Sequence, residues 1–422
     1  MIDYNVAVKF SSRGQNPAGA KDVSSVARRI AILGSTGSVG TQTLAVAEAA
    51  GKRLTVCALA ARSDVRALED QARRFRPRLA VLADETRAAQ LRVRLRDLPV
   101  RVAAGPEGLL EAATATEADA VVIAVSGCAG LEPALAALEA GKRVALANKE
   151  TLVAAGDLVM ATARRKKAEI LPVDSEHSAI FQALRGGRRT EVRKLILTAS
   201  GGPFLGWSAE ELKRVTPEEA LCHPRWRMGP KITVDSATMM NKALEVIEAR
   251  FLFDMPYEKI EVIIHPQSIV HSMVEFVDGA VLAQAGAPDM RLPIQYALSY
   301  PRRWPLRSAP VLDGETELTF IRPEKFDFPA LALGRRCALA GGTVPAAMNA
   351  ANEVFVRAFL DGRIRFTEIV PLTGEVAAAH EAAAADTLTA VLAAEQWARR
   401  RAEEMLAERD RGGAAAAGRC KL

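Results

Sequence analysis

The sequence lacks the features of secreted, membrane-spanning and disordered chains. Its five cysteines are scattered over 422 residues and form no CxxC pair, which argues against a disulfide framework and against a thiolate metal site. No apolar run reaches the roughly 18–20 residues that cross a bilayer, and residues 1–27 contain no apolar segment typical of a secretory signal. Hydrophobic residues still make up 49% of the chain, which is enough for a sizeable core. We therefore expect a soluble protein of the cytoplasm, without membrane attachment.

A large excess of either charge is also missing. The formal net charge of +6 is the difference between 56 basic and 50 acidic residues, and the basic blocks have acidic neighbours at helical spacing. The sequence contains no basic stripe and no recognisable nucleic-acid-binding module, so we expect no nucleic-acid partner. The small positive excess favours an anionic small-molecule substrate.

Changes in hydrophobic periodicity and composition along the chain predict an α/β protein with three domains. Short apolar strands first alternate with helices, as in a Rossmann-like, doubly wound parallel sheet. Strand-like runs then alternate with loops rich in Pro, Gly and His, and the last third is rich in alanine and helical. The predicted order is a loose leader (1–27), a cofactor-binding domain (28–170), a catalytic α+β domain (171–300), a connector (301–329), a C-terminal helical domain (330–411) and a fraying tail (412–422).

A glycine turn separates the first predicted strand, 29–33, from the helix 41–50. Gly34, Gly37 and Gly40 are spaced as GxxGxxG. Glycines at this place let the backbone approach a pyrophosphate, and the helix N-terminus supplies free N–H groups. A purely structural turn is the alternative, but the position in the first βαβ unit favours dinucleotide binding.

The end of the second strand distinguishes between the two nicotinamide cofactors. NAD sites usually carry an acidic residue here to bind the ribose 2′-hydroxyl, whereas this chain has Arg62 and Ser63. A guanidinium suits a 2′-phosphate. We therefore predict NADPH, unless Arg62 is only a solvated loop residue.

Two acidic segments are candidates for a metal site. Asp174 and Glu176 would share one face of an extended segment, and carboxylates are the ligands that a hard divalent cation prefers. Further on, helical periodicity places Asn241, Lys242 and Glu245 opposite an apolar stripe formed by Met240, Leu244, Ile247 and Phe251.

The residues before that helix are candidates for a phosphate site. We expect Asp235 and Ser236 at its N-cap, where backbone N–H groups bind anions. The alternative is a capped surface helix with a Lys242–Glu245 ion pair.

Three loops complete the set of candidates. Asn148, Lys149 and Glu150 follow a strand directly, at the edge where ligands bind in such sheets. A Gly-Gly turn follows Ser200, and residues 221–230 combine His223 and Trp226 with a terminal Gly-Pro, as in a lid. His265 and His271 are expected to support the loops rather than bind a ligand.

The chain strongly resembles the 1-deoxy-D-xylulose 5-phosphate reductoisomerase family over roughly residues 29–400. The resemblance rests on six stretches that occur in family order: GSTGSVG (34–40), ANKE (147–150), LPVDSEHSAIFQ (171–182), TASGGPF (198–204), HPRWRMGPKITVDSATMMNKALEVIEA (223–249) and HPQSIVHSMVEF (265–276).

The resemblance implies an NADP-dependent oxidoreductase of non-mevalonate isoprenoid biosynthesis. Such an enzyme uses NADPH and Mg²⁺ or Mn²⁺ to rearrange the sugar phosphate and reduce it to 2-C-methyl-D-erythritol 4-phosphate, and it is a homodimer formed through the central domain.

The resemblance also assigns residues to the site. The metal ligands would be Asp174, Glu176 and Glu245, and the catalytic residues Lys149, Glu176 and His223. The substrate would contact Lys149, Ser175, Glu176, Ser200, His223, Ser236, Asn241, Lys242 and Glu245. The cofactor would contact Thr36, Gly37, Ser38, Val39, Asn148, Glu150 and Gly229, in addition to Arg62 and Ser63. Trp226 and Met228 would belong to the lid.

Two other functions remain possible from the sequence. A simple NADPH dehydrogenase of a hydroxy acid or semialdehyde would need no three-carboxylate metal site. A non-catalytic cofactor sensor would be expected to have lost ligands, which are all present here. One departure from the family is Ala61-Arg62-Ser63, which replaces the usual Gly-Lys/Arg-Asn and affects the predicted ribose contacts.

Overall fold

A computed structural model describes the backbone of residues 28–419 except 116, 227, 308–310, 313–315 and 327. Side chains are described for the same residues except 325 and 412–419. The predicted leader, 1–27, lies outside the described residues.

The first half of the chain forms a seven-stranded parallel sheet in the order β4-β3-β2-β1-β5-β6-β7. Its strands are β1 (Arg28–Leu33), β2 (Leu54–Ala61), β3 (Leu79–Leu82), β4 (Arg101–Ala104), β5 (Ala120–Ile123), β6 (Arg143–Leu146) and β7 (Ile170–Pro172). The connecting helices are α1 (Ser38–Ala50), α2 (Val65–Phe75), α3 (Glu85–Arg94), α4 (Gly105–Thr114), α5 (Leu131–Glu139) and α6 (Glu150–Lys166). The order reverses between β1 and β5, which is where ligands bind in doubly wound sheets.

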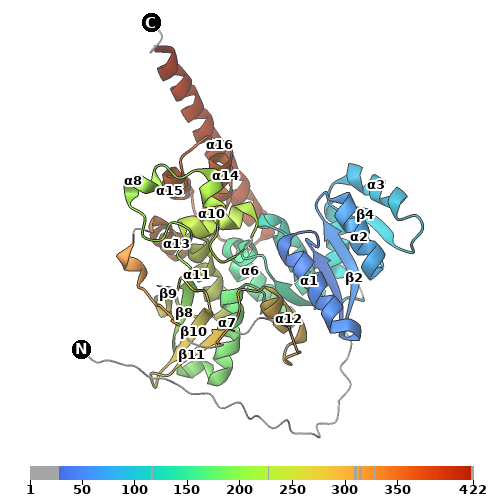
Figure 1. Ribbon diagram of the computed structural model, residues 1–422. Helices are drawn as coiled ribbons and strands as arrows, with labels where there is room; N and C mark the ends of the chain where they lie inside the picture. The colour runs from blue at the N-terminus through green and yellow to red at the C-terminus, as the bar shows by residue number, and fades with distance from the viewer. Residues whose placement is uncertain are drawn as a thin grey trace.

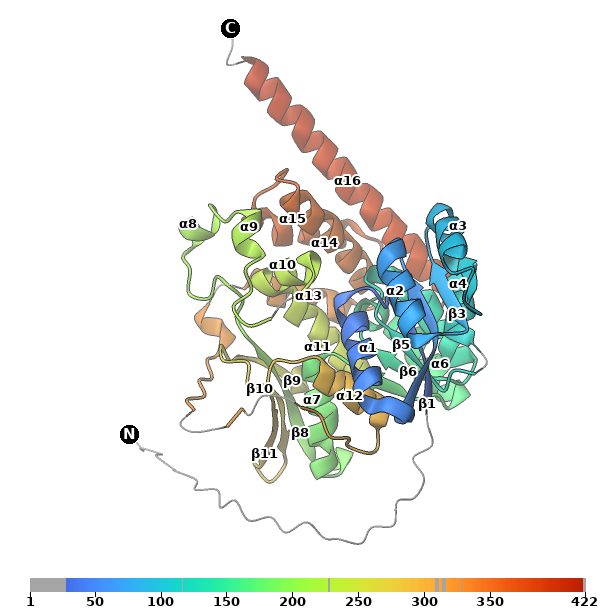
Figure 2. The same cartoon turned by 45° about the vertical axis from the view of Figure 1, so that its right-hand side comes forward.

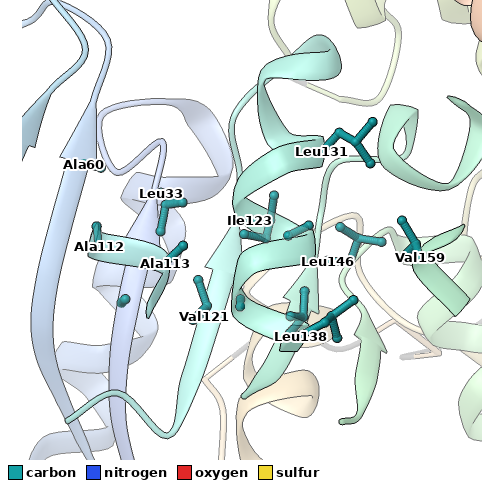
Figure 3. Packing of buried hydrophobic residues seen from close by; sticks show 14 of the residues in the cluster. Leu33, Ala60, Ala112, Ala113, Val121, Ile123, Leu131, Leu138, Leu146 and Val159 are labelled. Carbon is teal, nitrogen blue, oxygen red and sulfur yellow. The ribbon is translucent and has the colours of Figure 1, made fainter. Parts of the chain in front are cut away.

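Helices cover both faces of this sheet, and β1 contributes to both cores. Ala31 and Leu33 belong to the cluster packed against α5 and α6, which Figure 3 draws around Ile123, Leu131 and Val159. Ile30 and Ile32 belong to the cluster on the opposite face, with Leu44 of α1 and Leu68 of α2. Successive strand residues point to opposite faces, so a strand buried on both sides is apolar throughout.

A second sheet, with strands in the order β11-β10-β8-β9, is formed by the central segment. Its strands are β8 (Val192–Ala199), β9 (Ile260–Ile264), β10 (Val270–Phe276) and β11 (Val281–Ala285). The helices of this segment are α7 (Ser175–Ala183), α8 (Ala209–Leu212), α9 (Pro217–Ala220), α10 (Pro230–Thr238), α11 (Met240–Phe253) and α12 (Arg291–Ser299). Ile180 of α7 and Phe253 of α11 pack in one cluster with Leu195 and Val274 of the sheet. Residues Ile294 and Leu298 of α12 return to the core of the first sheet, which joins the two parts (Figure 1).

The last part of the chain is helical. It comprises α13 (Pro329–Ala340), α14 (Val344–Leu360), α15 (Ile369–Ala379) and α16 (Leu388–Arg419). Figure 2 shows α16 projecting beyond the other helices at its C-terminal end. This helix includes most of the segment predicted as a fraying tail, and its alanine run has the highest helix propensity. Within the described part of the chain, no helix is long and apolar enough to cross a membrane.

Short 3-10 turns connect these elements: η1 (Gly51–Arg53), η2 (Gly127–Gly130), η3 (Leu184–Gly186), η4 (Arg189–Glu191), η5 (Tyr257–Lys259), η6 (Pro323–Lys325) and η7 (Phe366–Glu368). The predicted domain boundary at residue 170 falls inside the first sheet, because the last strand of that sheet, β7, runs from Ile170 to Pro172.

Candidate active site

One cavity of about 690 Å³ lies between the carboxyl ends of the first sheet and the helices α7, α10, α11 and α12. Most of the predicted site residues line it. They are Ser38, Val39, Lys149, Asp174, Ser175, Glu176, Ser200, His223, Gly229, Ser236, Asn241, Lys242 and Glu245, together with the lid residues Trp226 and Met228. The structure thus brings segments that are far apart in the sequence to one place.

The glycine turn beside this cavity is tight, because two of its glycines have no room for a side chain. Gly34 has a φ of +89°, and a Cβ there would lie 2.4 Å from the carbonyl oxygen of Ala124. A Cβ on Gly40 would lie 2.1 Å from the carbonyl oxygen of Gly34. The turn therefore runs tightly from β1 into α1, and its first helical residues, Ser38 and Val39, face the cavity. A helix N-terminus of this kind offers free N–H groups to an anion.

The other predicted cofactor residues, except Gly229, are not among those that line the cavity. Thr36 and Gly37 belong to the turn itself. Arg62 is exposed directly after β2, and the carbonyl of the neighbouring Ser63 accepts a hydrogen bond from Arg87 at 2.9 Å. An exposed guanidinium at the carboxyl end of β2 is free to meet an anionic group.

Asn148 and Glu150 lie behind the cavity wall, on either side of Lys149. The Asn148 amide donates to the carbonyls of Val125 and Gly127 at 2.8 Å, and its oxygen accepts from the Thr151 N–H at 2.8 Å. Glu150 is 8% exposed and its carboxylate lies 3.1 Å from Lys231. Burial alone would raise the pKa of Glu150, but Lys231 lowers it. Both side chains are therefore engaged within the protein, and they orient the segment that carries Lys149.

Three carboxylates converge in the cavity. One oxygen each of Asp174, Glu176 and Glu245 lies within 4.8 Å of the others. The prediction of this grouping from an extended segment is wrong in its reasoning, because Asp174 caps α7 and Glu176 lies in its first turn. The cap and the first turn of one helix therefore place these two carboxylates together, and α11 supplies the third.

The polar face of α11 is as predicted, but the expected N-cap is wrong. Met240, Leu244 and Ile247 are buried in one apolar cluster, which turns Asn241, Lys242 and Glu245 to the cavity. Asp235 and Ser236, however, lie inside the preceding helix α10. Pro230 starts that helix and Met239, with a φ of +64°, ends it, so a sharp break separates Ser236 from α11.

Two buried lysines hold the carboxylates together. The Lys149 ammonium lies 2.6 Å from Asp174 and 3.1 Å from Glu245, and it donates to Asn241 at 2.6 Å. The Lys242 ammonium lies 3.0 Å from Glu176 and also donates to Glu245. Burial opposes the charged form of each lysine, but the facing carboxylates raise the pKa of both above the usual range. Both ammoniums are therefore charged at neutral pH.

The carboxylates themselves differ in their pKa values. Burial would raise the pKa of Asp174, but Lys149 holds it well below the usual range. Burial and the neighbouring Glu245 raise the pKa of Glu176 to about 7. With all three carboxylates ionised, as cation binding requires, they face two ammoniums and leave one excess negative charge. An oxygen-only, negatively charged donor set fits a hard divalent cation.

Sequence reasoning missed a supporting layer behind the carboxylates. His177 is fully buried, with Nδ1 lying 3.2 Å from Glu248 and 3.6 Å from Asp174, and Nε2 lying 2.9 Å from the carbonyl of Glu245. Burial opposes protonation, but Glu248 and Asp174 raise the pKa of His177 to about 9. This imidazolium ties α7 to α11 and so fixes the separation of Asp174 and Glu245. Nothing in the sequence around His177 or Glu248 indicates that the two helices pack against each other.

His223 is held in one tautomer by the loop around it. Its Nδ1 accepts hydrogen bonds from the N–H groups of Arg225 and Trp226, at 3.1 and 2.9 Å. The ring proton is therefore on Nε2, which donates to the Ser200 hydroxyl at 3.1 Å. Burial lowers the pKa of His223 to about 4. The imidazole is thus a neutral hydrogen-bond donor aimed into the cavity.

The remaining wall was not predicted. Residues Pro288, Asp289, Met290 and Arg291 at the start of α12 line the cavity, as does His271, whose ring centroid lies 6.1 Å from that of Trp226. Only the return of α12 to the first sheet brings this segment here. The contacts of both histidines agree with the predicted support of loops. The His265 ring binds the backbone of Thr319, Ile269 and Val270, and the His271 ring lies 3.3 Å from the Ala287 carbonyl.

Comparison with known proteins identifies the family. Three family models match consecutive parts of the chain: 1-deoxy-D-xylulose 5-phosphate reductoisomerase over residues 30–156, its C-terminal domain over 170–253, and the DXP reductoisomerase C-terminal domain over 285–401. The chain belongs to the 1-deoxy-D-xylulose 5-phosphate reductoisomerase family. The predicted family, and with it the prediction of an enzyme, is confirmed.

Reductoisomerases of known sequence and structure match almost the whole chain. The protein from Desulfitobacterium hafniense is 57% identical over 380 residues, covering 90% of this chain and 99% of that protein. The Heliobacterium modesticaldum protein is 58% identical over 385 residues, covering 90% and 98%.

Solved reductoisomerase structures confirm the fold class. The enzyme from Zymomonas mobilis in complex with NADPH has a TM-score of 0.84 and 44% identity, covering 90% of this chain and 99% of that one. A reductoisomerase in complex with NADPH, fosmidomycin and magnesium has a TM-score of 0.84 and 40% identity, covering 90% and 98%.

Proposed function

We propose that this chain converts 1-deoxy-D-xylulose 5-phosphate to 2-C-methyl-D-erythritol 4-phosphate, with NADPH and Mg²⁺ or Mn²⁺. The observation that carries the proposal is the meeting of two sites in one cavity: the carboxylates Asp174, Glu176 and Glu245, and the glycine turn at Ser38 and Val39. The solved relatives that were crystallised with NADPH and with magnesium support the same pair of cofactors.

The carboxylate cluster would hold the divalent cation. When bound, the cation supplies Lewis acidity at the substrate's carbonyl and hydroxyl oxygens, and NADPH supplies the hydride. Lys149 would be the catalytic cation of the protein itself, since its charged ammonium lies among Asp174, Asn241 and Glu245 and can donate a hydrogen bond to a substrate oxygen. Glu176 would contribute to catalysis as a ligand of the cation, which it would share with Asp174 and Glu245.

Donors on five segments would hold the sugar phosphate. Lys242 carries a full positive charge, and Asn241 and Ser236 line the same wall. Ser200 and the Nε2–H of His223 face them from the other side, and Ser175 lies next to the carboxylates. Neutral and cationic donors around one anion give both affinity and a defined orientation. The Gly-Gly turn lets the Ser200 loop approach Ser236 closely, because a Cβ on Gly202 would lie 2.8 Å from the Ser236 carbonyl oxygen.

The glycine turn and the end of β2 would hold NADPH. Backbone N–H groups at Thr36, Ser38 and Val39 suit the pyrophosphate, and Arg62 with Ser63 suits the 2′-phosphate. The Gly37 N–H donates to the Gly34 carbonyl at 3.1 Å, so Gly37 would contribute by close approach of its backbone. Gly229 borders the cavity at the start of α10, while Asn148 and Glu150 act by orienting the Lys149 segment. Trp226 and Met228 on the loop before α10 would cover the bound ligands and exclude water.

The test is the decay of NADPH absorbance with 1-deoxy-D-xylulose 5-phosphate in Mg²⁺, in Mn²⁺ and in EDTA. We expect decay that requires the metal and is absent with NADH. Folded protein that binds NADPH but gives no decay under any condition would reject the proposal.

We also propose the predicted domain roles and a cytoplasmic homodimer. Residues 28–170 would bind the cofactor, 171–300 carry the chemistry, and 330–411 support both. Buried, unpaired thiols at Cys57, Cys128 and Cys337 suit a reducing compartment.

The dimer would form through β11, an edge strand of the second sheet. Val281 and Leu282 on this strand and Val277 just before it are 47%, 39% and 65% exposed. An exposed apolar edge is a template for pairing with a second copy. Light scattering should give a dimer mass for the wild type and a monomer mass for Val281→Lys, and a monomeric wild type would contradict the proposal.

A further inference from the structure

A chain of buried polar contacts behind the cavity connects three helices that are distant in the sequence. The Lys231 ammonium of α10 lies 3.1 Å from the Glu150 carboxylate of α6 and 2.9 Å from Asp235 of its own helix. Asn352 of α14 donates to the second oxygen of Asp235 at 2.8 Å. Asp235 and Asn352 are 1% and 0% exposed. The two buried carboxylates therefore share one ammonium.

These contacts occupy one of three faces of α10. Ile232 and Ser236, four residues apart, line the cavity. Lys231 and Asp235, each one residue earlier, lie about 100° away around the helix and make the polar contacts. Val234 and Ala237 complete the helix surface and pack with Phe355 of α14 in an apolar cluster. The apolar face packs α10 against α14, and the polar face holds α10 next to α6 through the Lys231–Glu150 pair.

The Lys231–Glu150 pair matters because both helices carry cavity residues. Lys149 is the N-cap of α6 and Glu150 its first residue, while Ser236 lies on α10 opposite. The pair Glu150–Lys231 therefore spans the two helices that present Lys149 and Ser236 to the cavity. Loss of the shared ammonium would leave Glu150 and Asp235 facing each other without a counter-charge, which would push α10 away from α6.

We propose that Lys231 is a positioning residue that sets the place of Ser236 relative to Lys149. The inference rests on the proposed function, in which these two residues contact the sugar phosphate. Lys231 itself acts through α10 and does not line the cavity.

The test is steady-state kinetics of Lys231→Met at saturating NADPH and metal. We expect kcat/KM for the sugar phosphate to fall by roughly 10²-fold, mainly through KM, as for a misplacement of about 1 Å. Lys231→Arg should restore most of it, because a guanidinium can bridge both carboxylates. Lys213→Met is the matched control: this lysine is exposed and paired within one turn to Glu210, and its removal should leave KM unchanged.

A double-mutant cycle separates positioning from general destabilisation. If Lys231 acts through Ser236, adding Ser236→Ala to Lys231→Met should raise KM little further. Effects that multiply would overturn the proposal.

If Lys231→Met does not fold, the triple variant Lys231→Met/Glu150→Gln/Asp235→Asn removes the charges together. It should fold and show the same raised KM. A wild-type KM in the triple variant would also overturn the proposal. Wild-type protein without turnover would reject the proposed function, whereas normal turnover with an unchanged KM in Lys231→Met would reject only this inference.

Discussion

Replacing Glu245 by glutamine tests the carboxylate cluster directly. The side chain is 1% exposed and accepts hydrogen bonds from Lys149 at 3.1 Å, from Asn241 at 2.7 Å and from Lys242. Glu245→Gln keeps the shape and removes the charge. Each lysine retains another carboxylate, Asp174 or Glu176, and the cluster becomes neutral. We therefore expect only the loss of charge-assisted hydrogen bonding, about 1–3 kcal/mol of the free energy of unfolding.

The effect on a cation should be much larger. Two unit charges 4 Å apart at an effective dielectric constant of about 20 interact by about 4 kcal/mol, and a divalent ion feels more. The affinity for Mn²⁺ should therefore fall at least about 10³-fold, with loss of turnover and a drop in melting temperature of only a few degrees.

Three measurements check this prediction: Mn²⁺ binding followed by electron paramagnetic resonance, thermal unfolding, and NADPH turnover. Glu261→Gln on β9 is the control, since that carboxylate is exposed and pairs with Lys194 far from the cluster. Mn²⁺ affinity within about tenfold of the wild type, together with retained turnover, would refute the assignment of Glu245 as a ligand. Global unfolding would refute the reasoning about the lysines.

Further predictions concern the cofactor turn and the histidine loop. Gly40→Ala should abolish NADPH binding in a fluorescence titration, because its Cβ meets the Gly34 carbonyl oxygen; Gly374→Ala, with 3.5 Å to its nearest neighbour, should bind normally. Arg62→Ala should weaken NADPH binding about 10–100-fold in the same fluorescence titration, the cost of lost charge-assisted bonds, and leave NADH binding unchanged. An equal loss of affinity for both cofactors would contradict the assignment of Arg62 to the 2′-phosphate. His223 should titrate by NMR with a midpoint of about 4 rather than 6.5. Since its folded-state pKa is lowered, its protonation favours the unfolded state, and stability should fall as the pH drops from 6.5 towards 4, a dependence that His223→Gln should remove.

Elements with strong local signals were predictable almost to the residue. The sequence pattern predicts a helix over 65–75 and a strand over 270–276, and the structure has both with these bounds. The helix Val65–Phe75 begins after Asp64, whose side chain accepts a hydrogen bond from the Ala67 N–H. Two edge strands, β4 and β11, were not predicted. No residue of β4 is fully buried and β11 is largely exposed, so neither has the apolar run that marks a buried strand.

The same distinction holds for the candidate site: features fixed by one helix could be predicted, and contacts between separate helices could not. Helical periodicity predicted the polar face of α11, because a single helix fixes which residues share a face. The break at Met239 was not predictable from periodicity, so Ser236 was placed on the wrong helix. His177 with Glu248, and Asp289 with Arg291, reach the site only through tertiary packing between separate helices. Whether each predicted residue contacts a ligand stays a prediction.

The two lysines in the carboxylate cluster also bear on how the chain folds. Three buried carboxylates without partners would repel one another and oppose folding, but Lys149 and Lys242 already act as their internal counter-ions. Folding of this chain therefore does not have to wait for a metal. Chelation should give a folded but inactive protein, with a melting temperature close to that of the wild-type chain purified without metal. Added Mg²⁺ should then restore turnover without a refolding delay. The internal ion pairs thus separate the folding of the chain from its loading with a cation.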